Sequence, residues 1–237
     1  MQIPILAYHK IDFPTKDVRI KGAYTAPRRF AKQMRYLKKI GCEFYTASEL
    51  IEYYRENQKF PARGVAVTFD DGWKDNYTNA FPVLKELNIK ATIFLVPSCL
   101  GQVSSKVVAD GESAREHLSQ EDVLEMSRHN IEFGSHSLNH KLLHQTAPGE
   151  ATFEIEESKR QIENLLQKPC KTFAYPAGFF TDHARRAIER AGYIAAFSTV
   201  YGSNENPDLF ALNRTEILRR DRLPFSFARK VKPLLAD

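Results

Sequence analysis

Two groups of polar residues have the types and spacing needed for acid–base or metal chemistry. The first, in Thr68-Phe69-Asp70-Asp71-Gly72, is a pair of adjacent carboxylates that follows an apolar run. Adjacent strand residues point to opposite faces, so both carboxylates reach one site only where the chain turns, and Gly72 supplies that freedom. An acidic helix N-terminus would explain either Asp alone. The adjacent pair is a candidate for general acid or base chemistry.

The second group contains two histidines, His136 and His140, which are four residues apart. At this spacing the two imidazoles fall on one face of a helical turn and can hold one metal ion. Single histidines more often lie on the surface, and nearby His144 illustrates how they cluster by chance. With one carboxylate from Asp70 or Asp71, the pair would form a site with positions open for water, which is typical of catalytic metal centres.

The elements that must position these residues alternate between strand and helix along the chain. Apolar runs predict strands at 3–8, 64–69, 91–96, 131–134, 171–175 and 193–198. Amphipathic stretches with capping signals predict helices at 27–40, 48–57, 119–130, 148–166 and 181–192. This alternation favours a mainly parallel sheet or barrel of about seven strands in one domain over residues 1–237. Both polar groups then follow strands, at the end where barrel active sites lie.

Composition excludes several classes of protein. The chain has 237 residues, of which 43% are hydrophobic and 27% charged, so it can bury a large core and is not globally disordered. No run of about 18 apolar residues predicts a membrane span. The net charge of +5 is concentrated near the C-terminus, at Arg219, Arg220, Arg222, Lys230 and Lys232. We interpret it as an ordinary surface, because no nucleic-acid-binding signature accompanies it.

The cysteines and the N-terminal residues bear on the compartment. Cys42, Cys99 and Cys170 are widely spaced and form no C-x-x-C pair, which favours a reducing environment. The first residues contain neither a cationic segment nor a long apolar stretch, so no secretory signal is predicted. We therefore expect a cytoplasmic protein, although an exported protein that has lost its leader would have the same features.

Together the motifs resemble those of the polysaccharide deacetylase family, the NodB-homology carbohydrate esterases of family 4, whose fold is a deformed (β/α) barrel. The segment 68–72 matches the family's T-F-D-D-G motif, and 134–140 matches its H-[ST]-x-x-H motif, in the same order and at a similar separation. The segment 173–178, F-A-Y-P-A-G, resembles the third motif more weakly. The resemblance extends from Ile3 to about Ile217 and implies this α/β barrel fold.

The resemblance also implies a role for each matched residue. It makes Asp71, His136 and His140 the ligands of a divalent metal, for which we expect zinc, while cobalt, nickel, iron and manganese also suit such ligands. It makes Asp70 the general base. By the same analogy, the backbone N–H of Ala177 would stabilise the oxyanion of the reaction.

Two departures from the family pattern change these expectations. Ala174 stands where the family has the arginine that orients the base, and Arg214 is a candidate replacement. No histidine follows His183, although the family takes its catalytic acid from a histidine near the C-terminus. A circularly permuted subgroup, similar to the poly-N-acetylglucosamine deacetylases, carries this histidine on the first strand. His9 ends such a strand here, so we assign it as the general acid.

The expected function is metal-dependent hydrolysis of N-acetyl groups on polysaccharides or glycoconjugates that contain N-acetylhexosamine. Tyr175, Pro176, Trp73 and Arg214 lie in or near the motifs and are candidate substrate contacts. Two alternatives remain open. The same residues suit an O-acetyl esterase or another small-amide deacylase, and a non-catalytic glycan-binding relative would retain the fold. The sequence specifies neither the exact glycan nor the oligomeric state.

Overall fold

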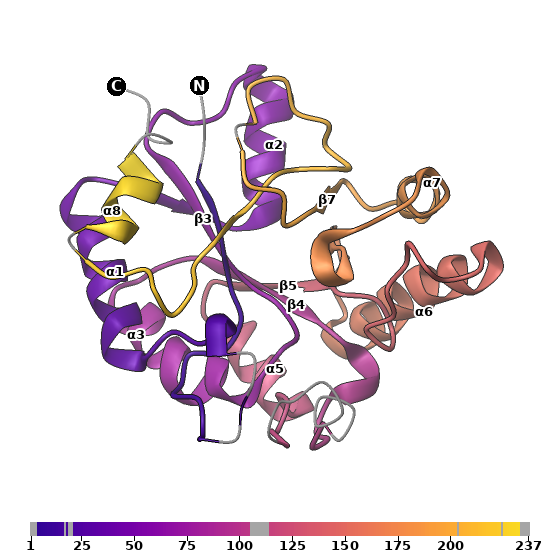
Figure 1. Cartoon of the computed structure of the whole chain (residues 1–237). Coiled ribbons are helices and arrows are strands. Elements are labelled where there is room, and N and C mark those ends of the chain that lie inside the picture. The colour runs from indigo at the N-terminus through magenta and orange to yellow at the C-terminus, as the bar shows by residue number, and fades with distance from the viewer. Residues whose placement is uncertain are drawn as a thin grey trace.

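The computed structural model describes residues 4–16, 18, 21–104, 114–202, 204–223 and 225–232. Their eight strands form a sheet in the order β7-β6-β5-β4-β3-β1-β8, and β2 pairs with β3 beside this path. Every pairing between named strands is parallel. Figure 1 shows the sheet curling, with helices around it. The predicted α/β class with a barrel-like parallel sheet is confirmed.

The strands are β1 (Ile5–Tyr8), β2 (Glu43–Tyr45), β3 (Gly64–Phe69), β4 (Ala91–Leu95), β5 (Ile131–Ser135), β6 (Thr172–Ala174), β7 (Ala195–Phe197) and β8 (Thr215–Glu216). The α-helices are α1 (Pro27–Lys39), α2 (Ala47–Asn57), α3 (Phe81–Glu86), α5 (Gln120–Met126), α6 (Pro148–Leu166), α7 (Asp182–Arg190) and α8 (Ser226–Val231). Short 3₁₀ helices are η1 (Lys21–Ala23), η3 (Pro97–Cys99) and η4 (Pro176–Gly178), and η2 (Asn76–Ala80) is π-helical.

The segment 209–217 contacts both edges of the sheet. Leu212 forms a parallel bridge with Phe197 of β7. Three residues later, β8 pairs with Leu6 and Ala7 of β1. This segment therefore connects β7 at one edge of the sheet with β1 near the other edge. The connection makes the sheet a deformed barrel instead of an open, flat layer.

Alternate strand residues enter two separate apolar clusters. Leu6, Val67 and Ile93 belong to the larger cluster, to which α1, α3, α5, α6, α7 and α8 contribute. Their strand neighbours Ile5 and Phe94 belong to a smaller cluster, which brings together residues of β1, β3, β4, β6, β7 and α2. Because this smaller cluster unites strands from opposite edges, it fills the concave face of the sheet, while the outer helices cover the convex face.

Helix α2 is fixed to the sheet at its amino end. A capping box at Thr46 starts the helix. The Ala47 amide donates to Thr92 Oγ1 (2.8 Å), and the Ser48 amide donates to Glu132 Oε2 (3.0 Å). The Thr92 hydroxyl donates in turn to the same Glu132 oxygen (2.8 Å). These bonds attach α2 to β4 and β5 and so help to fill the interior.

Helices α6 and α7 lie on one side of the molecule, and α1, α3 and α8 lie on the opposite side (Figure 1). Across the part of the chain that the structure describes, we find no helix with both the length and the apolar character needed to cross a membrane.

Candidate metal centre and active site

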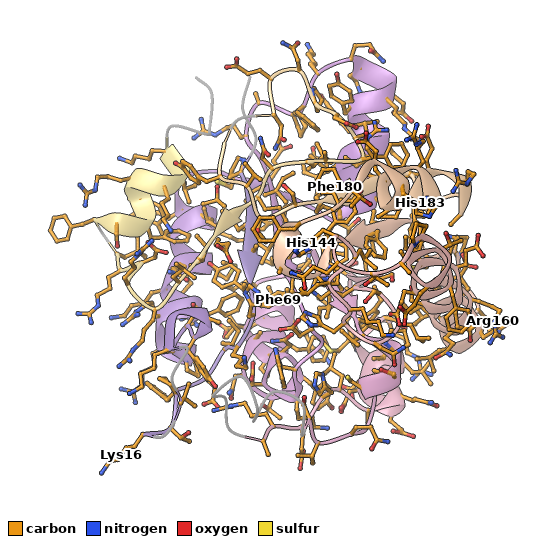
Figure 2. All side chains as sticks on the ribbon, turned by 45° about the vertical axis from the view of Figure 1, so that its right-hand side comes forward. Lys16, Phe69, His144, Arg160, Phe180 and His183 are labelled. Carbon is orange, nitrogen blue, oxygen red and sulfur yellow. The ribbon has the colours of Figure 1, made fainter. Side chains whose placement is uncertain are left out.

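The candidate residues come together because neighbouring parallel strands end at one edge of the sheet. His9 follows β1, Asp70 follows β3 and His136 follows β5. The Asp70 amide donates to the Tyr8 carbonyl (3.0 Å), which continues the β1–β3 pairing to the residues at this edge. Figure 2 shows Phe69, the last residue of β3, near the middle of the view. This is the end of the sheet at which we expected the chemistry.

A left-handed turn brings both carboxylates to this edge. The backbone φ angles of Asp71 and Gly72 are 74° and 68°. A non-glycine residue in this region is uncommon, although Asp tolerates it better than most, and such strain is typical of functional sites. Gly72 was expected to supply the turn, and the structure adds that Asp71 itself shares the unusual conformation.

Asp71, His136 and His140 offer three ligand atoms that lie within 4.8 Å of one another. The Nε2 atoms of His136 and His140 lie 3.5 Å and 3.3 Å from Asp71 Oδ1. The His136 side chain is 3% exposed, whereas that of His140 is 44% exposed. The group is therefore buried on one side and open to solvent on the other, which leaves room for a water molecule or a substrate atom.

The expected helical turn over 136–140 is wrong. Residues 136–140 form no helix, and Ser137 and His140 have φ angles of 63° and 56°. Glu154 of α6 holds this loop, because its Oε2 accepts from the Asn139 amide (2.8 Å) and its Oε1 from the Asn139 side chain (2.8 Å). The two imidazoles thus converge through irregular backbone and a buried carboxylate, and helical periodicity does not bring them together.

The three residues fit a divalent metal. His136 Nδ1 lies 2.7 Å from the Ala174 carbonyl, which can only accept, so Nδ1 carries the proton and Nε2 presents its lone pair to the site. Burial lowers the pKa of His136 to about 4, which keeps this ring neutral. Burial alone would raise the pKa of Asp71, but the hydrogen bond and charge of His140 outweigh it, so the pKa lies well below its ordinary value. A carboxylate and neutral imidazoles are the ligands that zinc prefers.

Arg214 makes a buried, two-pronged ion pair with Asp70. Its Nη1 and Nη2 atoms donate to Oδ1 and Oδ2 of Asp70, both at 2.7 Å. Its Nε donates to the Ser198 carbonyl (2.8 Å), and Nη1 also lies 3.2 Å from Thr68 Oγ1. The side chains of Arg214 and Asp70 are 0% and 2% exposed. This is the geometry of a residue that orients a carboxylate.

Burial by itself would raise the pKa of Asp70. The charge of Arg214 and its hydrogen bonds outweigh this effect and lower the pKa below its ordinary value. Asp70 is therefore ionised at neutral pH and able to accept a proton.

His9 and Ala177 lie on the strand ends next to this group. His9 is partly exposed and follows β1, and its main-chain carbonyl accepts from the Asn76 side chain (2.9 Å). Ala177 is exposed in η4, directly after β6, with a φ of 56°. Its carbonyl accepts from the Thr199 hydroxyl (3.2 Å). The assigned roles of both residues stay predictions.

The four residues expected to contact substrate are buried. Trp73 and Tyr175 are 3% and 0% exposed, Arg214 is 1% exposed, and Pro176 is also buried. The Tyr175 hydroxyl donates to the Phe210 carbonyl (2.8 Å), and the Trp73 indole N–H donates to Asp71 Oδ2 (2.7 Å). Side chains with so little accessible surface offer little area to a substrate, and the role of these four residues in substrate binding stays a prediction.

Sequence reasoning missed several supporting residues. Thr68, Ser198 and His117 contact site residues but lie in different parts of the chain. Thr68 is part of a recognised motif, so its hydroxyl was a signal that could have been used. Ser198 and His117 carry no local signal, because only the fold brings them to the site.

Comparison with known proteins agrees with this geometry. A family model described as polysaccharide deacetylase matches residues 57–196. The chain is 29% identical over 217 residues to YxkH of Bacillus subtilis (strain 168), which covers 91% of this chain and 71% of that protein. It is 30% identical over 192 residues to the poly-beta-1,6-N-acetyl-D-glucosamine N-deacetylase of Staphylococcus aureus (strain MSSA476), which covers 79% of this chain and 65% of that protein.

Solved structures show the same fold. The Streptococcus pyogenes deacetylase PplD, solved in complex with acetate, superposes with a TM-score of 0.82 at 28% identity, over 98% of both chains. IcaB from Ammonifex degensii superposes with a TM-score of 0.83 at 23% identity, over 99% of this chain and 97% of that one. The architecture is thus the deformed barrel of the NodB-type carbohydrate deacetylases. Since the family model covers more than half of the sequence, the chain belongs to the polysaccharide deacetylase family.

Proposed function

We propose that the chain is a metal-dependent N-deacetylase of glycans that contain N-acetylhexosamine. The observation that carries this proposal is the convergence of Asp70, held by Arg214, with the three ligand atoms of the candidate metal centre. The similarity to a poly-N-acetylglucosamine N-deacetylase supports N-acetylglucosamine units as the substrate. We propose zinc as the metal, with cobalt, nickel, iron and manganese as the other candidates.

When bound by Asp71, His136 and His140, a divalent cation would lower the pKa of a neighbouring water and polarise the acetyl carbonyl. The protein's own groups would move the protons. Asp70 is ionised and rigidly oriented, so it would accept a proton from the water that attacks the carbonyl carbon. His9, on the adjacent strand end, would protonate the leaving amine.

The developing negative charge on the acetyl oxygen needs a donor. The backbone N–H of Ala177 would supply one, because η4 lies directly after β6 at the same edge of the sheet. The products are a free amine on the sugar and acetate, so the reaction balances with water as the only co-reactant.

The proposal is tested by measuring zinc content and amine release from N-acetylglucosamine oligomers, before chelation, after chelation and after zinc is restored. We expect about one zinc per chain and zinc-dependent amine release in the wild type. His136→Ala should lose both, whereas Asp70→Asn should retain zinc and lose amine release. His183→Ala is the matched control, because His183 lies at the start of α7 and contacts the Pro148 carbonyl, outside the site.

Other outcomes would point to other functions. Bound zinc without amine release would contradict N-deacetylation, and a hydroxyl-release assay on O-acetylated glycans would then test the esterase alternative. Glycan binding that is unchanged in Asp70→Asn, with no turnover of either substrate class, would identify a non-catalytic relative. No zinc after add-back would overturn the metal-dependent mechanism.

A further inference from the structure

Two buried aromatic side chains form hydrogen bonds with Asp71. The Trp73 indole N–H donates to Asp71 Oδ2 (2.7 Å), and His117 Nδ1 lies 3.0 Å from the Asp71 main-chain carbonyl. That carbonyl can only accept, so His117 donates from Nδ1. The two rings stack with centroids 4.2 Å apart and an interplanar angle of 29°, and the residues are 3% and 5% exposed. One stacked pair therefore holds both the side chain and the backbone of Asp71.

The chain builds this pair from two distant segments. Trp73 and His117 form an antiparallel bridge, in which the Leu118 amide donates to the Gly72 carbonyl (2.9 Å) and flanking bonds continue the pairing. The Lys10 ammonium lies 4.4 Å from the centroid of the Trp73 ring, which gives the indole a cation–π contact from the residue after His9. The ring positions are therefore fixed by backbone pairing and by packing.

The two carboxylate oxygens of Asp71 have different partners. Oδ2 accepts the indole N–H, whereas Oδ1 faces Nε2 of both His136 and His140. Asp71 also has a φ of 74°, and the bond from His117 holds the peptide that carries this conformation. Partners of this kind orient a metal ligand and tune its affinity.

We infer that Trp73 and His117 are positioning residues that present Asp71 to the metal through Oδ1 alone. This inference rests on the metal centre of the proposed function. It assigns a role to the only tryptophan of the chain and to a histidine that no motif includes. The competing explanation is that the pair is simply part of the buried core, in which case its hydrogen-bonding groups have no effect on metal binding.

Variants that keep a ring and remove the hydrogen bond separate these explanations. We would measure zinc affinity of the full chain by competition with a chromogenic chelator for Trp73→Phe and His117→Phe. His129→Phe is the matched control, because His129 also lies against an aromatic ring, that of Phe81 at 5.7 Å, but outside the site. Urea unfolding of the metal-free proteins, followed by far-UV circular dichroism, shows whether each variant is folded. Tryptophan fluorescence is unsuitable, because Trp73→Phe removes the single tryptophan of the chain.

We expect the zinc dissociation constant to rise about 10- to 100-fold in both variants, and to stay within about twofold of wild type in His129→Phe. His117→Gln retains a donor for the Asp71 carbonyl, so its zinc affinity should recover towards the wild-type value. If His117→Phe fails to fold, Trp73→Phe carries the test. In the cobalt-loaded protein, Trp73→Phe should weaken the visible absorption bands, because release of Oδ2 raises the coordination number.

Wild-type zinc affinity in folded Trp73→Phe, and in His117→Phe where it folds, together with an unchanged cobalt spectrum, would overturn the inference and leave the proposed function intact. A wild-type protein that binds no zinc would overturn both, so the two failures are distinguishable.

Discussion

At the scale of single residues, the ion pair between Asp70 and Arg214 depends on the planar guanidinium, which binds both carboxylate oxygens at once. Arg214→Lys keeps the charge but can engage only one oxygen at a time. We expect kcat to fall by roughly 10- to 100-fold as Asp70 loses its fixed orientation. Zinc affinity should be unchanged, because the guanidinium binds Asp70 and not a metal ligand.

A matched control is available on the surface. Arg185 also binds both oxygens of a carboxylate, that of Asp208, at 2.9 Å and 2.8 Å. Arg185→Lys should leave kcat at the wild-type value, and steady-state kinetics with N-acetylglucosamine oligomers measures both variants. Equal kcat values for Arg214→Lys and wild type would show that the orientation of Asp70 does not limit the reaction.

Asp75 is a buried carboxylate whose ionisation should make the stability of the protein depend on pH. Burial and the charge of Asp12 raise the pKa of Asp75 to about 6, despite a hydrogen bond from the Ile11 amide. An unfolded Asp titrates near 4, so between these values the native state binds a proton that the unfolded state has released. The free energy of unfolding therefore falls as pH rises through this window, by at most about 3 kcal/mol.

Asp75→Asn should remove this pH dependence, because the amide oxygen can still accept from Ile11 but carries no charge. Urea unfolding of the metal-free wild type and variant near pH 4.5 and pH 7.5 measures the difference. The free energy of unfolding of Asp75→Asn minus that of wild type should be larger near pH 7.5 than near pH 4.5. A difference that is the same at both pH values would contradict the raised pKa.

At the scale of elements, Gly134 in β5 allows the strand that carries His136 to pack closely. A Cβ atom at this position would lie 2.6 Å from two ring carbons of Phe94 and 2.8 Å from the Thr172 carbonyl oxygen. We expect Gly134→Ala to lower the free energy of unfolding by about 1–3 kcal/mol, because the neighbouring backbone cannot move aside freely. Urea unfolding followed by circular dichroism measures the change.

Gly149 in the first turn of α6 is the corresponding control. A Cβ atom there would contact nothing within 4 Å, and its φ is not left-handed. Gly149→Ala should therefore be neutral or stabilise the protein by up to about 1 kcal/mol. A stability loss in Gly149→Ala as large as that in Gly134→Ala would mean that close packing does not explain the effect of Gly134→Ala.

The elements also show which features the sequence could predict. Strands β3 and β4 were visible because most of their five or six successive residues are apolar. Strands β2 and β8 were missed, because they have three and two residues and exist only through pairing with β3 and β1. The expected helical turn at 136–140 failed for a similar reason, since contacts with α6 determine that loop.

At the scale of the whole molecule, the site is completed only when the barrel closes. Asp70 and Asp71 are recognisable from the sequence, because a strand and a turn place them locally. Arg214 was named only as a candidate, since it reaches Asp70 across 144 residues from the segment that joins β7 to β1. Orientation of the base therefore depends on the position of this closing segment, which no local pattern encodes.

Inside the barrel, two threonines have different partners, one in the candidate site and one in helix α2. Thr68 and Thr92 are paired in register on β3 and β4. The Thr68 hydroxyl contacts Arg214 (3.2 Å), whereas the Thr92 hydroxyl accepts from Ala47 of α2 and donates to Glu132. Thr92→Val should therefore lower the free energy of unfolding by about 1–3 kcal/mol, because a buried amide and a carboxylate each lose a partner.

Thr68→Val is the same change one strand away. It also removes a buried hydrogen bond, to the Leu6 carbonyl (2.9 Å), so it should lower the free energy of unfolding too, but unlike Thr92→Val it should act on the reaction. Arg214 would lose one of the groups that fix its plane, so we expect kcat to fall several-fold while zinc affinity is retained. Thr92→Val should keep the wild-type kcat at temperatures where it is folded, because the Thr92 hydroxyl bonds to Ala47 and Glu132 and not to Arg214. Urea unfolding measures the free energy of unfolding of both variants, and steady-state kinetics measures their kcat. A lower kcat in Thr92→Val without one in Thr68→Val would mean that the attachment of α2, and not the support of Arg214, controls the geometry of the site.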